Sequence, residues 1–476
     1  MSANSPKEIL INEYAKNLKC GSASLFIGSG LSRKANYSGW KDILRNCARE
    51  IGLDVEKEER NLITLAQYYI RVKQRTQITE TIKEFFSDGN GTVQDVHRII
   101  ASLPVTNVWT TNYDTLIERA YEEEGISTTI ITDDESYCNI DRAAKIKIHK
   151  IHGTVKTAGK CIIARQDYDL FPKTHDIVLS ELKGEMCSNS FLFLGYSFSD
   201  TDIQHILTRI RLEYENQHPQ RHFCIVEKVK RGINENEEDY EYRTILQNHY
   251  VADMQCYGIT VVLVDSYDEI ESILLSIRNK VYEKNILISG SYDDENQIAS
   301  RISAITTGLV SSLVQKGYKI ITGYGKNLGS NITDGAYDGW TKTNKKTKDF
   351  SNALQIFTFP FRRKKTKARD TLYSEIRERM VSLTKYTIII AGTTNGRNAQ
   401  GVLEEYKLSN SSNHLIIPIA TTGGSARQVW DELNKIEKYR NNELFQLLAK
   451  EIDTNNIVKT VIDLIEDNRE DLSYGA

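Results

Sequence analysis

Short apolar runs alternate with amphipathic segments along almost the whole chain. Runs rich in β-branched and aromatic residues predict strands that are buried on both faces. In the first part of the chain these runs are 24–27, 107–109, 145–149, 190–194, 221–226 and 259–264. In the second part they are 285–291, 318–325, 354–359, 386–391 and 414–419. Because helical patterns such as 201–214 and 267–281 separate the runs, we predict parallel sheets with helices on both faces.

The series of strands starts again near residue 284, where an apolar run leads into a turn of small residues. A chain of 476 residues is also too long for a single hydrophobic core. We therefore predict an α/β protein with two doubly wound, Rossmann-like domains, residues 1–283 and 284–476. Within the first domain, residues 54–91 have helical patterns and no strand pattern, which indicates a helical insertion.

Composition narrows the class of protein without deciding its function. The net charge of −3 gives no general attraction to nucleic acid or to anionic membranes, and no apolar run is long enough to span a bilayer. The seven cysteines are scattered with no Cys-x-x-Cys pair, which argues against a disulfide framework and against a four-cysteine zinc ribbon. We expect a cytoplasmic protein that binds no metal.

Small and polar residues follow three predicted strands of the first domain. The segment Gly28-Ser29-Gly30-Leu31-Ser32 closes the first strand, Asn112 and Asp114 follow the second, and His152 follows the third. Ligands of doubly wound sheets bind at the carboxyl ends of the strands, so we predict a nucleotide site there. The glycines would let backbone N–H groups approach a phosphate, and the His152 imidazole could act as a general base.

Structural roles compete with this interpretation at each position. The glycines also fit a tight turn, Asp114 fits the N-cap of a helix over 115–122, and a lone histidine is more often structural than catalytic. Asn112 precedes that helix and has no capping role. A fourth segment could hold ribose hydroxyls or could cap the next helix; its residues include Gly195, Ser197 and Asp202.

These segments resemble the sirtuin family, because Gly-Ser-Gly-Leu-Ser, Thr-x-Asn-x-Asp, Lys-x-His-Gly and Gly-Tyr-Ser-x-x-Asp occur in that family's order over residues 8–282. The resemblance implies NAD+ as the ligand and cleavage of its nicotinamide–ribose bond. It implies that His152 is the general base, that Asn112 holds the nicotinamide ribose and an attacking water, and that Asp114 contacts the nicotinamide end. Further NAD+ contacts are implied for Gly28, Ser29, Gly30, Ser32, Gly195, Ser197 and Asp202.

One departure from the sirtuin pattern changes the expected activity. Sirtuin deacylases carry a zinc ribbon beside the groove for acyl-lysine; this chain lacks the cysteines, and its helical insertion could cover that groove. Water is then the expected nucleophile, and the expected activity is that of an NAD+ glycohydrolase that forms ADP-ribose and nicotinamide. Two alternatives stay open: a sirtuin-type NAD-dependent protein deacylase, and a non-catalytic nucleotide sensor in which His152 is structural.

Glycine-rich turns also follow strands of the second domain. Their candidate ligand residues are Gly290, Ser291, Gly323, Gly325, Lys326, Thr394 and Arg397. Arg377 lies on a predicted helix over 369–383, and Glu404 and Glu405 open the helix after Gly401. A glycine-rich turn before a helix can hold a phosphate. The competing structural roles are a solvated helix face for the arginine and favourable charge at a helix N-terminus for the carboxylates.

These pieces resemble the SLOG superfamily of nucleotide-binding folds: Ser-Gly-Ser, the Gly-Tyr-Gly loop, Ile-Arg-Glu-Arg-Met and the glycine-rich loop before Glu404 and Glu405. The hydrolase motif of related folds is degraded here, so the resemblance implies ligand sensing. It implies that Arg377 grips a phosphate and that Glu404 or Glu405 binds a ribose, with the turn residues allowing close backbone approach.

A sirtuin-like domain followed by a SLOG domain resembles the effector family of the bacterial Thoeris anti-phage system. The resemblance implies that a partner TIR-domain protein makes a cyclic ADP-ribose isomer and that the SLOG domain binds this signal. The sirtuin-like domain would then become active and deplete NAD+. The resemblance also implies a homotetramer assembled through the sirtuin-like domains.

Overall fold

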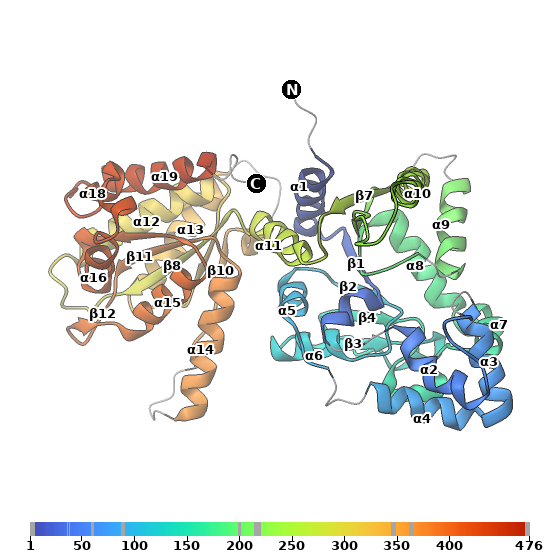
Figure 1. Ribbon diagram of the computed structural model, residues 1–476. Coiled ribbons are helices and arrows are strands. Elements are labelled where there is room, and N and C mark those ends of the chain that lie inside the picture. Colours follow the sequence, from blue (N-terminus) through green and yellow to red (C-terminus); the bar gives the residue numbers. More distant parts are fainter. Residues whose placement is uncertain are drawn as a thin grey trace. The chain divides into compact units, whose positions relative to one another are not determined.

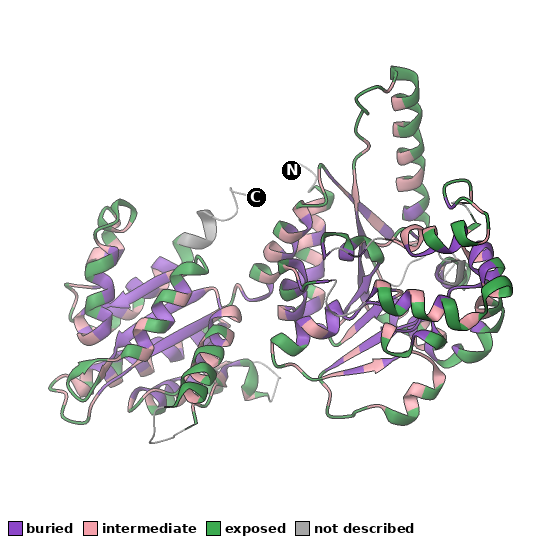
Figure 2. Ribbon diagram, turned by 60° about the horizontal axis from the view of Figure 1, so that its bottom comes forward, coloured by how far each residue is buried: buried purple, intermediate pink, exposed green. Residues whose placement is uncertain are grey.

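The computed structural model describes residues 5–35, 37, 39–58, 61–86, 91–198, 201–213, 220–343, 349–360 and 366–471, with backbone alone for 201–202 and 468–471. The chain divides into two compact units, Met1–Val281 and Tyr282–Ala476 (Figure 1). The predicted fold class is confirmed, since one unit holds a parallel sheet of seven strands and the other a parallel sheet of five. The strands of both sheets are largely buried (Figure 2).

The sheet of the first unit has the order β3-β4-β2-β1-β5-β6-β7. From β1 the chain moves to one side through β2 and β4, then returns to the other side of β1 at β5, so the strand order reverses beside β1. A reversal of this kind leaves a crevice at the carboxyl ends of the central strands. The strands are β1 (Ala23–Ile27), β2 (Asn107–Thr110), β3 (Thr128–Ile131), β4 (Ile146–Lys150), β5 (Ser190–Leu194), β6 (His222–Glu227) and β7 (Ile259–Val264).

Sequence analysis located six of these strands within one or two residues and missed β3. This strand has only four residues, lies at the edge of the sheet and pairs with β4 alone. Its residues alternate between partly and fully buried positions, so it lacks the continuous apolar run that marks a central strand.

Helices cover both faces of this sheet (Figure 1). They are α1 (Pro6–Lys19), α2 (Trp40–Glu50), α3 (Leu62–Lys73), α4 (Arg75–Phe85), α5 (Asp95–Ser102), α6 (Leu116–Glu123), α7 (Arg165–Thr174), α8 (Asp176–Ser188), α9 (Thr201–Glu213), α10 (Glu237–Cys256) and α11 (Glu269–Val281). The predicted helical insertion corresponds to α3 and α4, and its described residues contain no strand. It also includes α2, because apolar residues of α2, α3 and α4 share one buried cluster with Tyr113 and Leu116.

The second unit repeats the plan on a smaller scale, with the strand order β10-β9-β8-β11-β14. Its strands are β8 (Asn285–Ser291), β9 (Lys319–Thr322), β10 (Leu354–Ile356), β11 (Tyr386–Ala391) and β14 (Leu415–Ile419). Sequence analysis missed the antiparallel hairpin of β12 (Thr393–Thr394) and β13 (Arg397–Asn398), which is too short to carry a hydrophobic pattern. The helices are α12 (Ala299–Gln315), α13 (Leu328–Lys342), α14 (Lys367–Ser382), α15 (Gln400–Ser411), α16 (Gly424–Leu433), α17 (Glu437–Arg440), α18 (Glu443–Leu447) and α19 (Thr454–Asp471).

The imidazole of His149 lies deep in the core of the first unit. The ring of His149 on β4 stacks on that of Trp109 on β2, with the ring centroids 3.7 Å apart and the planes 10° from parallel. Trp109 Nε1 donates a hydrogen bond to Glu185 Oε2 on α8 at 2.9 Å, whereas neither ring nitrogen of His149 has a hydrogen-bond partner among the described residues. Burial disfavours the imidazolium and lowers the pKa of His149 to about 4.

This burial predicts a loss of stability in mild acid. The unfolded imidazole has a pKa of about 6.5, so between about pH 6.5 and 4 the unfolded state binds a proton that the folded state does not. The free energy of unfolding should therefore fall as the pH is lowered, with this histidine contributing about 2 kcal/mol of loss by pH 5. Urea denaturation at pH 7.5 and pH 5.0 measures the effect.

The comparison uses His149→Phe, which keeps a ring against Trp109 but cannot titrate. We expect the wild-type chain to lose about 2 kcal/mol more than His149→Phe between the two pH values. The matched control is His249→Phe, because His249 is exposed on α10. An equal loss in the wild type and in His149→Phe would contradict the prediction.

Candidate active site and candidate signal site

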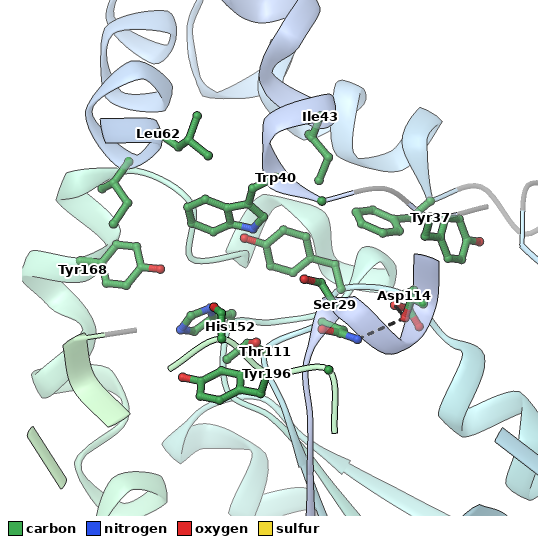
Figure 3. A pocket seen from close by; sticks show the side chains of 18 of the residues that line it. Ser29, Tyr37, Trp40, Ile43, Leu62, Thr111, Asp114, His152, Tyr168 and Tyr196 are labelled. Carbon is green, nitrogen blue, oxygen red and sulfur yellow. Dashed lines mark hydrogen bonds between the residues drawn. The ribbon is translucent and has the colours of Figure 1, made fainter. Parts of the chain in front are cut away.

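A cavity of about 360 Å³ lies at the carboxyl ends of β1, β2, β4 and β5. Ser29 and Ser32 come from the turn after β1, Asn112 and Asp114 from the loop after β2, and His152 from the turn after β4. Gly195 and Ser197 follow β5 and also line it. Residues from four different loops thus meet at one crevice, as the topology requires (Figure 3). The side chain of Asp202 lies outside the described residues.

The Asn112 side chain is held by a chain of directed hydrogen bonds. Ser32 Oγ donates to Asp114 Oδ2 at 2.9 Å, and Asn112 Nδ2 donates to Ser32 Oγ at 3.2 Å. A carboxylate can only accept, so the single hydroxyl proton of Ser32 goes to Asp114 and the hydroxyl oxygen must accept from the amide NH₂. This order fixes which end of the amide is which. Asn112 Oδ1 is left as an acceptor with no hydrogen-bond partner among the described residues.

Asp114 also holds the start of the following helix. Its Oδ1 accepts from the backbone N–H of Leu116 at 3.0 Å, while the N-cap residue of α6 is Thr115. The N-cap is therefore Thr115, one residue after the predicted Asp114. The Asp114 carboxylate nevertheless accepts hydrogen bonds both from the start of the helix and from Ser32.

His152 lies just beyond β4, and Gly153 makes the turn that presents it. Gly153 has φ of +94°, a backbone conformation that side-chain-bearing residues rarely adopt. The imidazole is buried, with the rings of Tyr168 and Phe171 edge-on to it at 5.7 and 5.8 Å between centroids. It lies with Thr111 and Tyr196 on one side of the cavity (Figure 3).

The glycines after β1 allow two loops to pack closely, and their backbone N–H groups already donate hydrogen bonds within the protein. Gly28 N–H donates to the Leu194 carbonyl at 2.8 Å, and Gly30 N–H donates to the Gly195 carbonyl at 2.9 Å. A Cβ at Gly28 would collide with the Gly195 carbonyl oxygen, so the two loops touch through backbone alone. Both amides are engaged, and neither glycine lines the cavity, whereas Ser29 does.

The candidate signal residues of the second unit gather at the corresponding edge of its sheet. Gly290 and Ser291 end β8, Gly323, Gly325 and Lys326 follow β9, and Thr394 and Arg397 lie in the hairpin after β11. A Cβ at Gly325 would collide with the Gly290 carbonyl oxygen, so the glycines bring the β8 and β9 ends into backbone contact. Ser291 Oγ donates to the Thr393 carbonyl at 2.9 Å, and Lys326 Nζ pairs with Asp294 at 3.0 Å.

Arg377 lies where α14 meets α15. The interpretation that it lies on a solvated helix face was wrong. Its side chain is only 13% exposed, and its guanidinium lies over the rings of Phe359 and Tyr373. Nη1 pairs with Glu404 Oε2 at 2.6 Å, and Nε lies 3.7 Å from Glu405 Oε1. The cation is therefore already matched by two carboxylates.

The two glutamates do not supply charge to a helix N-terminus, so that interpretation was also wrong. Helix α15 begins at Gln400, which places Glu404 and Glu405 in its second turn, with no acidic residue in the first. Glu405 is buried and accepts a hydrogen bond from Ser289 Oγ on β8. Burial raises the pKa of Glu405, which Ser289 and Arg377 partly oppose.

Two family models match the chain. The model for the SIR2-like domain covers residues 106–250, and the model for the Sir2- and TIR-associating SLOG family covers residues 269–468. The NAD(+) hydrolase ThsA of Bacillus cereus (strain MSX-D12) is 30% identical over 98% of this chain and 99% of its own length. This chain belongs to the ThsA family of NAD(+) hydrolases.

Other relatives agree with this membership. The ThsA of Cytobacillus dafuensis is 31% identical over 91% of this chain and 90% of its own length. Defense-associated sirtuin 2 of Bacillus subtilis is 23% identical over 42% of this chain and 20% of its own length, so that likeness is confined to part of each protein. Along this chain the SIR2-like model matches first and the SLOG model second.

Several apolar and aromatic residues that line the cavity of this ThsA-family chain were not predicted from the sequence. Trp40 and Ile43 come from α2 and Leu62 from the start of α3, and they face His152 and Tyr196 across the cavity (Figure 3). Tyr168 of α7 also lines it. Their signal was weak, because helical periodicity predicts that an aromatic residue on an amphipathic helix is buried. It does not show whether that residue packs in the core or lines a cavity.

The described residues of this ThsA-family chain contain neither a metal-binding cluster nor a membrane-spanning helix. None of them form a group of three or more His, Cys, Asp or Glu side chains that could hold a metal ion. Within the same residues, no helix is both long and apolar enough to cross a membrane.

Proposed function

We propose that the first unit hydrolyses NAD+ to ADP-ribose and nicotinamide, with His152 as general base and Asn112 as the residue that holds the reacting ribose and the attacking water. The observation that carries the proposal is the oriented Asn112 amide in a cavity that His152 also lines. Asp114 and Ser32 orient that amide, and Ser29, Gly195 and Ser197 lie where NAD+ would be contacted.

The reaction asks little of these groups. The bond between the ribose carbon and the cationic nicotinamide ring breaks, and nicotinamide leaves as a neutral molecule. A water oxygen bonds to the same carbon, and its proton goes to the His152 imidazole. Asn112 Oδ1 accepts a hydrogen bond from that water or from a ribose hydroxyl. Positioning supplies most of the rate, and general-base help contributes about 10²–10⁴-fold.

A specific observation argues against protein deacylation by this chain. The side of the cavity that faces His152 carries apolar residues of α2 and α3, including Trp40, Ile43 and Leu62. An extended acyl-lysine peptide would need that side open. Nicotinamide release from NAD+ with and without an acetyl-lysine peptide tests the point, and a strict requirement for the peptide would contradict hydrolysis.

We further propose that the second unit, residues 284–476, is a sensor for a cyclic ADP-ribose isomer made by a partner TIR-domain protein. Arg377 would grip a phosphate in place of Glu404, and the freed Glu404 or Glu405 would accept ribose hydroxyls. Lys326, Thr394 and Arg397 lie at the same sheet edge as Gly290, Ser291, Gly323 and Gly325. The matched family is the Sir2- and TIR-associating SLOG family, and the association with TIR proteins supports the proposal.

Regulation requires the signal to bind the active state better than the resting state. Moving a population from about 1% to about 99% active needs about 5.5 kcal/mol of differential binding. Charge-assisted contacts from Arg377 to a diphosphate are strong enough to contribute a large part of it. We propose that the chain works in the cytoplasm as a homotetramer joined through its SIR2-like units, and that activation depletes NAD+ in anti-phage defence.

One assay tests the catalytic role and the sensor role together. The chain is incubated with NAD+ alone and with each member of a panel of cyclic ADP-ribose isomers, and nicotinamide and ADP-ribose are quantified by chromatography. We expect slow cleavage alone and strong stimulation by one isomer. Cleavage that no isomer stimulates would contradict the sensor role, and no cleavage under any condition would contradict the catalytic role.

A further inference from the structure

A buried ion pair lies directly behind the candidate active site. Lys150, the last residue of β4, is 1% exposed, and its Nζ donates to Glu118 Oε1 on α6 at 2.8 Å. The same ammonium donates to the backbone carbonyl of Asp114. The second carboxylate oxygen of Glu118 has no hydrogen-bond partner among the described residues. Nothing in the proposed reaction uses either charge.

Stability alone is a poor explanation for this pair. An ammonium and a carboxylate taken out of water lose hydration that their mutual attraction only partly replaces. Apolar residues of similar volume often do as well or better at such a position. The second carboxylate oxygen of Glu118, which accepts no hydrogen bond from the described residues, makes the pair less favourable still. Because the pair is a poor source of stability, its role is better sought in the groups that it holds in place.

Lys150 joins the two loops that carry the candidate catalytic residues. It stands two residues before His152, and the carbonyl that it binds belongs to Asp114. The Asp114 carboxylate orients Ser32, which in turn orients the amide of Asn112. The ammonium therefore anchors the first member of that hydrogen-bond chain to the strand that presents His152. Two backbone bonds also join these segments, from Ile151 N–H to the Thr110 carbonyl at 3.1 Å and from Val155 N–H to the Tyr113 carbonyl at 2.9 Å.

We propose that Lys150, held by Glu118, is a positioning residue that sets the distance and orientation of Asn112 relative to His152. This inference rests on the proposed catalytic roles of Asn112 and His152. It assigns Lys150 no contact with NAD+. Its effect is on the reacting geometry rather than on the affinity for the substrate, because the ammonium lies behind the loop and does not line the cavity.

The test replaces the pair with apolar residues, Lys150→Met with Glu118→Leu. Removing both charges together leaves no unpaired charge in the core, so the variant should unfold thermally close to the wild type. We expect kcat for NAD+ to fall about 100-fold while KM changes less than about threefold, because small misplacements of reacting groups cost rate without weakening binding. Rates are measured with NAD+ under the conditions that give the wild type its highest rate.

The matched control is Lys147→Met with Glu181→Leu. Lys147 lies on the same strand, pairs with Glu181 at 3.4 Å and is 41% exposed, and this pair should leave kcat unchanged. If the apolar Lys150 pair does not fold, Lys150→Gln with Glu118→Gln decides. This double variant is neutral, keeps two polar side chains in the core and removes the ammonium that anchors the Asp114 carbonyl, so a loss of kcat is again expected.

A folded pair variant with wild-type kcat overturns the inference, as does a loss confined to KM. Asn112→Ala and His152→Ala are measured in the same assay. If these two lose activity while the Lys150 pair variants keep it, the positioning role alone fails. If Asn112→Ala and His152→Ala keep activity, the proposed catalytic assignment fails instead.

Discussion

Replacing His152 by alanine is expected to lower the rate of NAD+ hydrolysis by about 10²–10⁴-fold, the range of general-base contributions. Asn112→Ala should have an effect of the same order, because it removes the amide oxygen that is proposed to accept from the ribose or the water. Both losses should appear mainly in kcat. The measurement is nicotinamide release at saturating NAD+ under conditions that stimulate the wild-type chain.

Two controls separate catalysis from folding in this experiment. His249→Ala and Asn248→Ala make the same changes at exposed positions on α10 and should leave the rate unchanged. Ser32→Ala is the more informative companion, because it removes the hydroxyl that fixes the amide while Asn112 itself stays. We expect a smaller loss than in Asn112→Ala. If Asn112→Ala and His152→Ala hydrolyse NAD+ at the wild-type rate, the chain is a non-catalytic sensor at this site.

Replacing Arg377 by alanine is expected to abolish activation by the cyclic ADP-ribose isomer and to leave unstimulated NAD+ cleavage as it is in the wild type. A charge-assisted contact to a phosphate is worth about 1.5–3 kcal/mol, so the affinity for the signal should fall about 10- to 100-fold. Isothermal titration calorimetry of the full chain with the isomer measures this directly. Unchanged affinity in Arg377→Ala would refute the assignment.

The structure supplies the control for this variant. Arg379 lies on the same helix two residues away, is partly buried, and Arg379→Ala should bind the signal as the wild type does. Arg377→Lys keeps the charge but cannot reproduce the planar fork, so intermediate affinity is expected. Thermal unfolding is recorded for each variant, because Arg377 also faces the buried Glu405.

Much of the fold was predictable because it follows from local pattern. The alternation of apolar runs and amphipathic helices predicted both sheets. The small and polar residues that follow β1, β2 and β4 predicted where the cavity of the first unit lies. Elements that lacked such a pattern were missed: β3 and the β12–β13 hairpin are too short. The cavity-lining residues of α2 were also missed, because helical periodicity shows that a face is buried but not what it covers.

The side-chain partners could not be predicted, because they come from residues far apart in the chain. Asn112 and Ser32 are 80 residues apart, and only their contact decides which end of the amide is left as an acceptor. Lys150 and Glu118 are 32 residues apart, and Arg377 and Glu404 are 27 apart. In each case the sequence shows that a polar residue is present, and the contact shows which hydrogen bonds or ion pairs it makes.

Local pattern in the sequence was enough to predict the alternation of the longer strands with helices, the two-domain class and the residue types available for NAD+ chemistry, because hydrophobic periodicity and turn composition are local properties. How those residues are used follows from the tertiary structure. The glycines after β1 are engaged with the loop after β5, Arg377 is matched by carboxylates rather than by solvent, and Lys150 is buried beside the loops that carry the candidate catalytic residues. These outcomes depend on which loops the sheet order brings together, and that order is a property of long-range packing.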